Sequence, residues 1–349
     1  PMSVMVGVGR GAQNGVLIKN AEALEKMNKD NTLIVDKTGT ITEGKPTVDT
    51  VGAFEGSFSK IEILQYIVSL NTNSEHPLAA ATVNYAKEQN TEIIKSDGFS
   101  AVTGKGVEGQ VNGKNIALGN PEMMAHAKAE ISSKMLEEAK TYQKQGKTVS
   151  FLAIDHKVSG YVVIGDKIKE TSAKAIKALQ NKGIDVVMLT GDNHNTAQAV
   201  ASELNLADFK ASMLPEDKLK EVEKLQKNGR VVAMAGDGIN DAPALAKSDV
   251  GIAMGTGTDV AIESAMITLV KGDLHGIVKA RHLSHAVMRN IKQNLFFALV
   301  YNTLGVPIAA GVLYPVFGLL LSPMIAALAM SFSSVSVIVN ALRLRNVKI

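Results

Sequence analysis

Five short apolar segments constrain the fold of this chain more than any other feature of its sequence. Each is a nearly continuous hydrophobic run, which is typical of strands buried on both faces of a parallel sheet. They are residues 32–35, 161–164, 185–189, 231–235 and 250–254. Helical patterns separate the later ones, at 170–181, 195–204, 216–226 and 241–246. Repeated strand–helix–strand units predict an α/β fold with a doubly wound parallel sheet.

Acidic and hydroxyl side chains follow three of these segments. Asp36 comes directly after the first, Thr190 directly after the third, and Asp237 shortly after the fourth. In an open parallel sheet, ligands bind outside the carboxyl ends of the strands, so these side chains are expected to converge there. A lone aspartate after a strand commonly forms a turn, whereas three such groups indicate a site. At this point Asp36 has three open roles: metal ligand, acid or nucleophile.

The stretch between the first two segments has a different pattern. Helical patterns lie at 59–69, 77–87 and 132–144. A hairpin is predicted by residues 107–111 and 114–118 around Asn112-Gly113, a dipeptide that strongly favours two-residue turns. These elements predict a separate α+β domain, residues 47–159, inserted into a sheet domain that is thereby split into 30–46 and 160–275.

Two long apolar runs near the C-terminus, residues 295–313 and 316–342, are each close to the roughly 20 residues that cross a bilayer. Only Tyr314-Pro315 lies clearly between them, and basic residues flank the pair on both outer sides. The flanking residues are Arg289, Lys292, Arg343, Arg345 and Lys348. The positive-inside bias therefore predicts a transmembrane hairpin within residues 276–349, with both ends cytoplasmic. The alternative is a helical hairpin buried in a soluble protein.

Composition excludes several classes of site. The 349 residues include no Cys, so a disulfide, a zinc–thiolate site or a cysteine nucleophile within this chain is impossible. The formal net charge of +3 is too small to argue for a nucleic-acid partner, and none is expected.

A carboxylate at the end of a strand has a well-defined use in phosphoryl transfer. As a nucleophile, Asp36 would attack the γ-phosphorus of ATP and form an aspartyl phosphate. The transferred group is anionic and needs cations and donors rather than a base, and we expect Lys218 and Thr190 to supply them. Mg²⁺ prefers oxygen ligands. The expected magnesium ligands are Asp36, Asp237, Asp241 and the backbone carbonyl of Thr38, with Asn240 helping to hold the loop and the metal-bound waters.

A soluble phosphatase of similar layout is the rival interpretation. Such enzymes generally carry a second aspartate two positions after the nucleophile, where it acts as acid and base. Thr38 occupies that position here and is a poor proton donor. The phosphorylated state is therefore expected to persist, as an energy-transducing intermediate must.

Three motifs in combination resemble those of the P-type ATPases. They are Asp36-Lys37-Thr38-Gly39-Thr40, Thr190-Gly191-Asp192 and Gly236-Asp237-Gly238-Ile239-Asn240-Asp241. The resemblance implies that Asp36 is phosphorylated from ATP in the presence of Mg²⁺. It also implies that the sheet is the phosphorylation domain and that the insertion is the nucleotide-binding domain. The catalytic set that it implies comprises Asp36, Lys37, Thr38, Thr190, Gly191, Asp192, Lys218 and Asn240.

The insertion resembles the heavy-metal branch of that family through Ser74-Glu75-His76-Pro77-Leu78. The resemblance implies that Glu75 and His76 contact the adenine of ATP. Gly104 and Gly106, in Thr103-Gly104-Lys105-Gly106, would let the nucleotide approach the backbone, and Gly119-Asn120 would add a further wall. Several relatives carry Glu where this chain has Asn71, so its nucleotide affinity is open.

The C-terminal runs resemble the Cu⁺-exporting subclass. The first helix reads Asn294, directly before the run, then Tyr301-Asn302 and Pro307, and the second reads Met330, Ser333-Ser334 and Asn340. The resemblance implies that Tyr301, Asn302, Met330 and Ser334 contact transported Cu⁺. Polar groups in membrane helices often mark such pathways, although small and hydroxyl residues also serve only to pack helices together.

The resemblance also implies that this chain is part of a longer pump. In relatives a Cys-Pro-Cys motif lies just upstream of a segment like Pro1-Met2-Ser3, and residues 1–29 would be the cytoplasmic end of that helix with its connector. The expected partners are membrane lipid, the missing N-terminal half with its actuator domain, and a copper chaperone. The expected location is a bacterial inner membrane, with several spans and the soluble domains cytoplasmic. A truncated nucleotide-binding module without transport is the remaining alternative.

Overall fold

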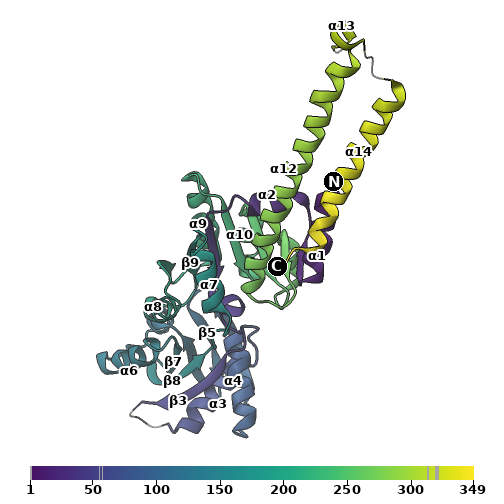
Figure 1. Cartoon of the computed structure of the whole chain (residues 1–349). Coiled ribbons are helices and arrows are strands. Elements are labelled where there is room, and N and C mark those ends of the chain that lie inside the picture. The colour runs from purple at the N-terminus through teal and green to yellow at the C-terminus, as the bar shows by residue number, and fades with distance from the viewer. Residues whose placement is uncertain (1, 55, 57, 313, 319–321) are drawn as a thin grey trace.

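The computed structural model describes residues 2–54, 56, 58–312, 314–318 and 322–349. Two sheets and a pair of long helices follow one another along its length (Figure 1). The six-stranded sheet lies at one end, the seven-stranded sheet lies in the middle, and the helical pair projects from the other end.

The seven-stranded sheet has the order β1-β13-β12-β11-β2-β9-β10. All neighbouring pairs are parallel except β1 with β13. Its strands are β1 Val16–Ile18, β2 Thr32–Asp36, β9 Asp185–Leu189, β10 Asp208–Lys210, β11 Val232–Gly236, β12 Val250–Met254 and β13 Ile267–Leu269. Four of the five segments predicted for a parallel sheet are therefore confirmed as its strands. The three strands of three residues at and near the edges are too short to give a periodic signal.

Helices cover both faces of this sheet, as a doubly wound fold requires. In β2, Leu33 and Val35 pack into one core while Ile34 packs into the opposite one. That alternation explains the continuous apolar run, because neither face of the strand meets water. The helices and short turns of this part are α2 Ala21–Met27, η1 Lys37–Ile41, α7 Ser172–Gln180, α8 His194–Glu203, α9 Pro215–Lys227, η2 Ile239–Asp241, α10 Ala242–Lys247 and α11 Asp259–Ser264.

The six-stranded sheet is antiparallel, with the order β3-β8-β7-β6-β5-β4. Its strands are β3 Thr47–Ala53, β4 Ser96–Val102, β5 Gly106–Val111, β6 Lys114–Gly119, β7 Thr148–Ile154 and β8 Lys157–Gly165. The predicted hairpin is confirmed as β5–β6, and both turn residues have positive φ, 52° at Asn112 and 74° at Gly113. Helices α3 Lys60–Asn71, α4 Pro77–Glu88, α5 Pro121–His126 and α6 Ser133–Gln143 pack against this sheet.

The assignment of residues 161–164 to the parallel sheet is wrong. This segment lies in β8, which pairs antiparallel with both β3 and β7. Seven consecutive residues of β8 are buried, because the strand is central and carries a hydrophobic core on each face. An apolar run reports burial on both faces and carries no information about strand direction.

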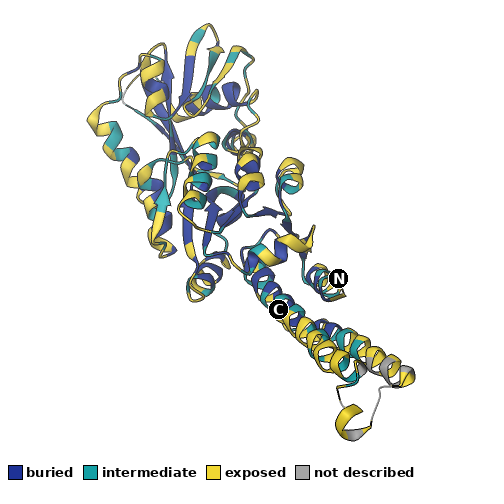
Figure 2. Cartoon of the chain, turned by 90° about the horizontal axis from the view of Figure 1, so that it is seen from above, coloured by how far each residue is buried: buried dark blue, intermediate teal, exposed yellow. Residues whose placement is uncertain are grey.

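The C-terminal pair consists of α12 His275–Ala309 and α14 Pro323–Leu342, with α13 Tyr314–Phe317 at the far end and η3 Arg343–Asn346 after α14. α1 Met2–Gln13 packs beside its base. The start of α12 is held to the sheet part by a buried ion pair between Arg281 and Asp30 and by a hydrogen bond from Ser284 to the carbonyl of Leu24. Figure 2 shows that exposure increases toward the projecting end.

Two helices therefore occupy most of the predicted apolar runs, but their boundaries differ from the prediction. The residues expected to form the connection, Tyr314 and Pro315, begin α13. Leu313, the predicted end of the first run, lies outside the described residues. Among the described residues, no helix is both long enough and apolar enough to span a membrane.

Candidate active site

Three adjacent strands in the interior of the parallel sheet bring the predicted motifs together. β2 lies between β11 and β9, with Val35 opposite both Ala235 and Met188. Asp36 ends β2, Thr190 follows β9, and Asp237 follows β11. Their convergence at the carboxyl edge follows from the parallel order, since equivalent ends of parallel strands meet at one edge of the sheet.

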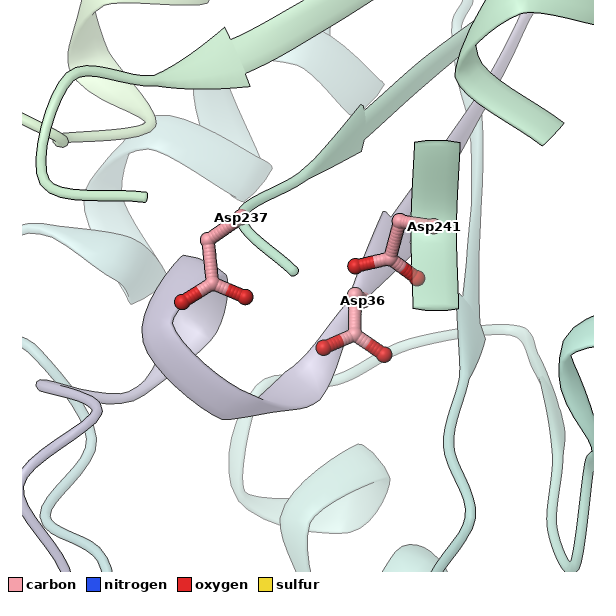
Figure 3. A group of neighbouring side chains, drawn as sticks. All are labelled: Asp36, Asp237 and Asp241. Carbon is pink, nitrogen blue, oxygen red and sulfur yellow. The ribbon is translucent and has the colours of Figure 1, made fainter. Parts of the chain in front are cut away.

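Three carboxylates form the centre of this site. Asp36, Asp237 and Asp241 each place an oxygen within 4.8 Å of the others (Figure 3). Asp36 and Asp241 are buried, while Asp237 is half-buried. Lys218 from α9 joins the two buried members, with its Nζ 2.6 Å from Asp36 Oδ1 and 2.7 Å from Asp241 Oδ1. Lys218, which was predicted to supply a cation to the transferred phosphoryl group, therefore contacts Asp36 directly.

Burial and mutual repulsion alter the titration of these groups. Burial raises the pKa of Asp36 to about 7; Asp241 adds to the rise, and Lys218 opposes it. Burial and Asp241 also raise the pKa of Asp237, to about 6. For Lys218, burial disfavours the ammonium, but Asp36 and Asp241 outweigh it and the pKa is raised. A cation brought to Asp36 and Asp237 would therefore stabilise both ionised carboxylates.

The raised pKa values predict how stability depends on pH when Mg²⁺ is absent. The folded chain holds the Asp36 proton up to about pH 7, whereas an unfolded aspartate releases it near pH 3.9. Between these values the folded state binds more protons, so raising the pH favours unfolding. The Asp36→Asn variant lacks this proton. We therefore compare the free energies of unfolding of the variant and the wild type, measured with urea. The value for the variant minus that for the wild type should be larger at about pH 8 than at about pH 5, by roughly 1–3 kcal/mol. An equal difference at both pH values would contradict the assignment.

The loop after Asp36 is shaped by Gly39. η1 departs from helical geometry at Thr38 (φ −71°, ψ 131°) and at Gly39 (φ 70°, ψ −18°). A Cβ at Gly39 would lie 1.6 Å from Asp237 Oδ2. The glycine therefore allows both a left-handed backbone and the close approach of a carboxylate that is a candidate metal ligand.

Replacing Gly39 by Ala should disturb the site more than the fold. The methyl group would displace the Asp237 carboxylate, and the positive φ would add strain of about 1–3 kcal/mol. The apparent affinity for Mg²⁺ should fall at least tenfold (about 1.4 kcal/mol). It is measured from the rise of the unfolding temperature with Mg²⁺ concentration. Gly229→Ala is the matched control, because Gly229 has φ 78° and nothing lies within 4 Å of its added Cβ. Equal loss of Mg²⁺ affinity in both variants would contradict a specific role for Gly39.

Lys37, Thr190 and Asp192 form a second group at the same edge. Lys37 is buried and pairs with Asp192, whose backbone N–H donates to Thr190 Oγ1 at 3.1 Å. Thr148 at the start of β7 donates to Asp192 Oδ1 at 3.1 Å. A side chain of the six-stranded sheet therefore contacts the same carboxylate as Lys37. No sequence signal singles out Thr148, because its contact with Asp192 depends on how the two sheets pack.

Two further predicted residues lie at the surface of the site. Gly191 is exposed beside Asp192, and Asn240 is exposed in the short turn η2. Asp241 is held more firmly, because its Oδ2 accepts from the backbone N–H of Gly238 at 3.3 Å while its Oδ1 accepts from Lys218.

The donor set fits Mg²⁺. Clustered carboxylate oxygens are ligands that this ion prefers. Asp36 and Asp237 are the members that face the η1 loop, and Thr38 lies in that loop (Figure 3). Asp241 already satisfies both oxygens through Lys218 and Gly238. A direct bond to the metal was predicted for Asp36, Thr38, Asp237 and Asp241. The arrangement supports this role most strongly for Asp36 and Asp237.

Four of the six predicted nucleotide residues lie together in the six-stranded sheet part. Gly106 pairs with Gly119 across β5 and β6, and Asn120 Nδ2 donates to the carbonyl of Gly104 at 2.9 Å. A Cβ on Gly106 would lie 2.1 Å from the carbonyl oxygen of Leu118, and one on Gly119 would lie 2.2 Å from that of Lys105. These glycines are therefore required by the close packing of two backbones, whatever else they do.

Glu75 and His76 lie at the start of α4 and are exposed. His76 Nδ1 accepts from the backbone N–H of Leu78 at 3.2 Å and so caps the helix. Its pKa is lowered by desolvation, while Asp192 acts in the opposite direction. Asn71 is buried and donates to Thr82 Oγ1 at 2.9 Å, so it joins α3 to α4.

The residues predicted to contact transported metal lie on α12 and α14. Tyr301, Asn302, Met330 and Ser334 are all exposed. Asn302 donates to the carbonyl of Ala298 at 2.8 Å and Ser334 to that of Met330 at 3.2 Å, each within its own helix. Their assignment to a metal pathway stays a prediction.

Comparisons with known proteins converge on one family. The profile of the haloacid dehalogenase-like hydrolases matches residues 31–249. A copper-transporting P-type ATPase of Rhizobium leguminosarum bv. viciae is 55% identical over the whole chain, which covers 41% of that protein. A silver exporting P-type ATPase of Salmonella typhimurium is 53% identical, again over the whole chain and 42% of the relative. The crystal structure of a zinc-transporting PIB-type ATPase in its E2.Pi state aligns with a TM-score of 0.70 at 35% identity, over 99% of this chain and 55% of that one. The chain thus spans less than half the length of these curated relatives.

Proposed function

The chain belongs to the P-type ATPases among the haloacid dehalogenase-like hydrolases, and on that premise we propose that it is the ATP-binding and phosphorylated part of a pump that exports monovalent copper. The observation that carries the proposal is the contact of Lys218 with Asp36 beside Asp237 at the edge of the parallel sheet. This arrangement supports an attacking carboxylate, a fixed cation next to it, and an oxygen-lined position for Mg²⁺.

The proposed reaction has two steps. An oxygen of Asp36 attacks the γ-phosphorus of ATP, the bond to the bridging oxygen breaks, and ADP leaves with that electron pair. Water then attacks the phosphorus of the acyl phosphate, so that the Asp36 carboxylate and inorganic phosphate are regenerated. Lys218 and Thr190 stabilise the charge on the transferred group, and bound Mg²⁺ supplies further positive charge. Thr38 supplies no general acid or base two positions after Asp36, so no carboxylate there activates the water of the second step, which favours a phosphoenzyme that persists.

The domain roles follow from the same premise. The boundary predicted between residues 159 and 160 moves to the end of β8: we assign residues 30–46 and 166–275 to the phosphorylation domain and 47–165 to the nucleotide-binding domain. ATP would contact Glu75, His76 and the turn of Gly104 and Gly106. The direct contacts between the two sheets, such as Thr148 with Asp192, support a nucleotide carried close to Asp36. β8 joins the antiparallel sheet, so the connection back to the phosphorylation domain begins after Gly165.

We further propose that α12 and α14 lie in a bacterial inner membrane, with the sheets in the cytoplasm. Large apolar side chains exposed along the outer part of α12 and along α14 support this, because lipid would cover them. Tyr301, Asn302, Met330 and Ser334 would then face Cu⁺ as substrate within a bundle completed by an N-terminal half, and a copper chaperone would deliver the ion. The copper and silver named in similar proteins fit the soft sulfur of Met330.

Labelling tests the catalytic proposal. The wild-type chain, given Mg²⁺ and ATP radiolabelled at the γ-phosphate, should retain label after acid quenching and lose it to hydroxylamine, as acyl phosphates do. A phosphatase would instead turn over a small ester such as p-nitrophenyl phosphate rapidly without retaining label. Nucleotide binding without label under any ionic condition would support a binding module and contradict the proposed reaction.

A second measurement tests the metal. In a pump restored to full length, Met330→Ala should lower Cu⁺-stimulated ATP hydrolysis, because the thioether is the soft ligand of the proposed set. Ser331→Ala is the control, since Ser331 lies on the same helix and donates to the carbonyl of Ala327. Unchanged Cu⁺ dependence in the Met330 variant would contradict the copper assignment.

A further inference from the structure

Lys169 lies outside the motifs to which the proposed reaction assigns roles, yet its ammonium group reaches η1, the loop after Asp36. It belongs to the segment between β8 and α7. Its Nζ lies 2.5 Å from the carbonyl oxygen of Gly39, 3.1 Å from that of Thr40 and 2.7 Å from that of Gly272. All three contacts are to backbone carbonyls, so they depend on the path of the chain rather than on neighbouring side chains.

These carbonyls come from two segments that are far apart in the sequence. Gly39 and Thr40 belong to η1, the loop directly after Asp36. Gly272 lies in the turn before α12 and has φ 58°. The same turn is braced by Asp273, whose Oδ1 accepts from Thr171 Oγ1 and from the backbone N–H of His275, each at 2.8 Å. The segment that carries Lys169 thus holds the start of α12 beside the loop of the nucleophile.

The convergence of three carbonyls needs a cation. Their oxygens carry partial negative charge and would repel one another without a shared donor. An ammonium group has three N–H donors and no acceptor, which matches this set. Lys169 is half-buried, so desolvation lowers its pKa, while the Asp237 carboxylate acts in the opposite direction. The ammonium therefore donates hydrogen bonds to the backbone of the loop and places a positive charge near the Asp237 carboxylate.

The position of Gly39 matters for the reaction. Its backbone lies against Asp237, where even a methyl group would collide with Oδ2. A shift of the Gly39 carbonyl would therefore move the loop relative to Asp237 and to Asp36, the residue at the start of the loop. Displacements of this size in reacting groups typically cost large factors in rate.

We propose that Lys169 is a positioning residue for phosphoryl transfer, which fixes the η1 loop and ties it to the turn that begins α12. The inference rests on the proposed function, because its effect is expressed in the phosphorylation of Asp36. Lys169 then physically connects the loop after the phosphorylated Asp36 to the base of α12. A movement of that loop on phosphorylation would be transmitted to Gly272 through a single ammonium group.

Lys169→Ala in the 349-residue chain tests the proposal. The rate of phosphoenzyme formation from γ-labelled ATP should fall at least about tenfold, while the affinity for a fluorescent ATP analogue changes less than about twofold. Propylammonium added in the millimolar range should restore label, because the small cation can refill the three-carbonyl site. An unfolded variant would not be rescued by an amine. Propanol, which has a similar size but no charge, should restore no label.

Lys167→Ala is the matched control. Lys167 lies two residues away and is largely exposed, with its Nζ 3.8 Å from Glu170 Oε1. Its variant should label at the wild-type rate and show no response to the amine. The proposal is overturned if Lys169→Ala labels at the wild-type rate, or if its label is lost and no amine restores it. A wild-type chain that takes no label would instead contradict the proposed function itself.

Discussion

Replacing Asp36 by Asn is expected to abolish the acid-stable label, reducing it by at least about 1,000-fold. An amide oxygen is a far weaker nucleophile than a carboxylate and forms no acyl phosphate. Lys218 keeps Asp241 as a partner at 2.7 Å, so its buried ammonium does not become unpaired. The loss should therefore arise from chemistry rather than unfolding, which rapid acid quenching and circular dichroism of the same sample can separate.

Asp208→Asn is the control for this substitution. Asp208 is an exposed aspartate in β10, in the same sheet but away from the carboxyl edge of β2. The control should label at the wild-type rate. Label that survives in the Asp36 variant and remains sensitive to hydroxylamine would place the nucleophile elsewhere.

Lys218→Met is expected to produce the second-largest effect, a fall of at least about 100-fold in the rate of phosphoenzyme formation at neutral pH. Methionine approximates the length of the side chain but leaves two buried carboxylates facing each other without a cation. Lys218 opposes the rise in the pKa of Asp36, so its removal should move that pKa above about 7. A larger share of Asp36 is then protonated and unable to attack, and the remaining rate should rise toward alkaline pH.

Quenched-flow measurement of the phosphorylation rate against pH tests this prediction. Lys220→Met is the matched control, because Lys220 lies on the same helix but is largely exposed. Its pH profile should coincide with that of the wild type. A Lys218 variant with an unchanged profile and rate would show that the contact with Asp36 does not govern its ionisation.

The site was largely predictable because its residues sit at positions fixed by the sheet. Once Asp36, Thr190 and Asp237 were placed after parallel strands, their convergence followed from topology. The proximity of Asp36, Asp237, Asp241 and Lys218 was likewise expected from the chemistry of phosphoryl transfer, and the role of the three carboxylates as magnesium ligands stays a prediction. The resemblance to P-type ATPases, carried by the same motifs, agrees with the family that the comparisons identify.

The parts that were not predictable depend on packing between distant segments. The sequence pattern placed 161–164 in the wrong sheet because buried antiparallel and parallel strands look alike. Thr148 and Lys169 had no signal at all, since each acts on residues more than forty positions away in the chain. The three-residue strands β1, β10 and β13 obtain their stability from neighbouring strands rather than from their own pattern.

In the proposed reaction, the carboxylate of Asp36 carries the phosphate from ATP. Reduction of the acid-quenched phosphoenzyme with borohydride converts an acyl phosphate at an aspartate into homoserine, which peptide mass spectrometry locates. We expect homoserine at position 36 alone, and only after incubation with both ATP and Mg²⁺. Homoserine at Asp237 or Asp241, or none at any position in a sample that carries label, would contradict it.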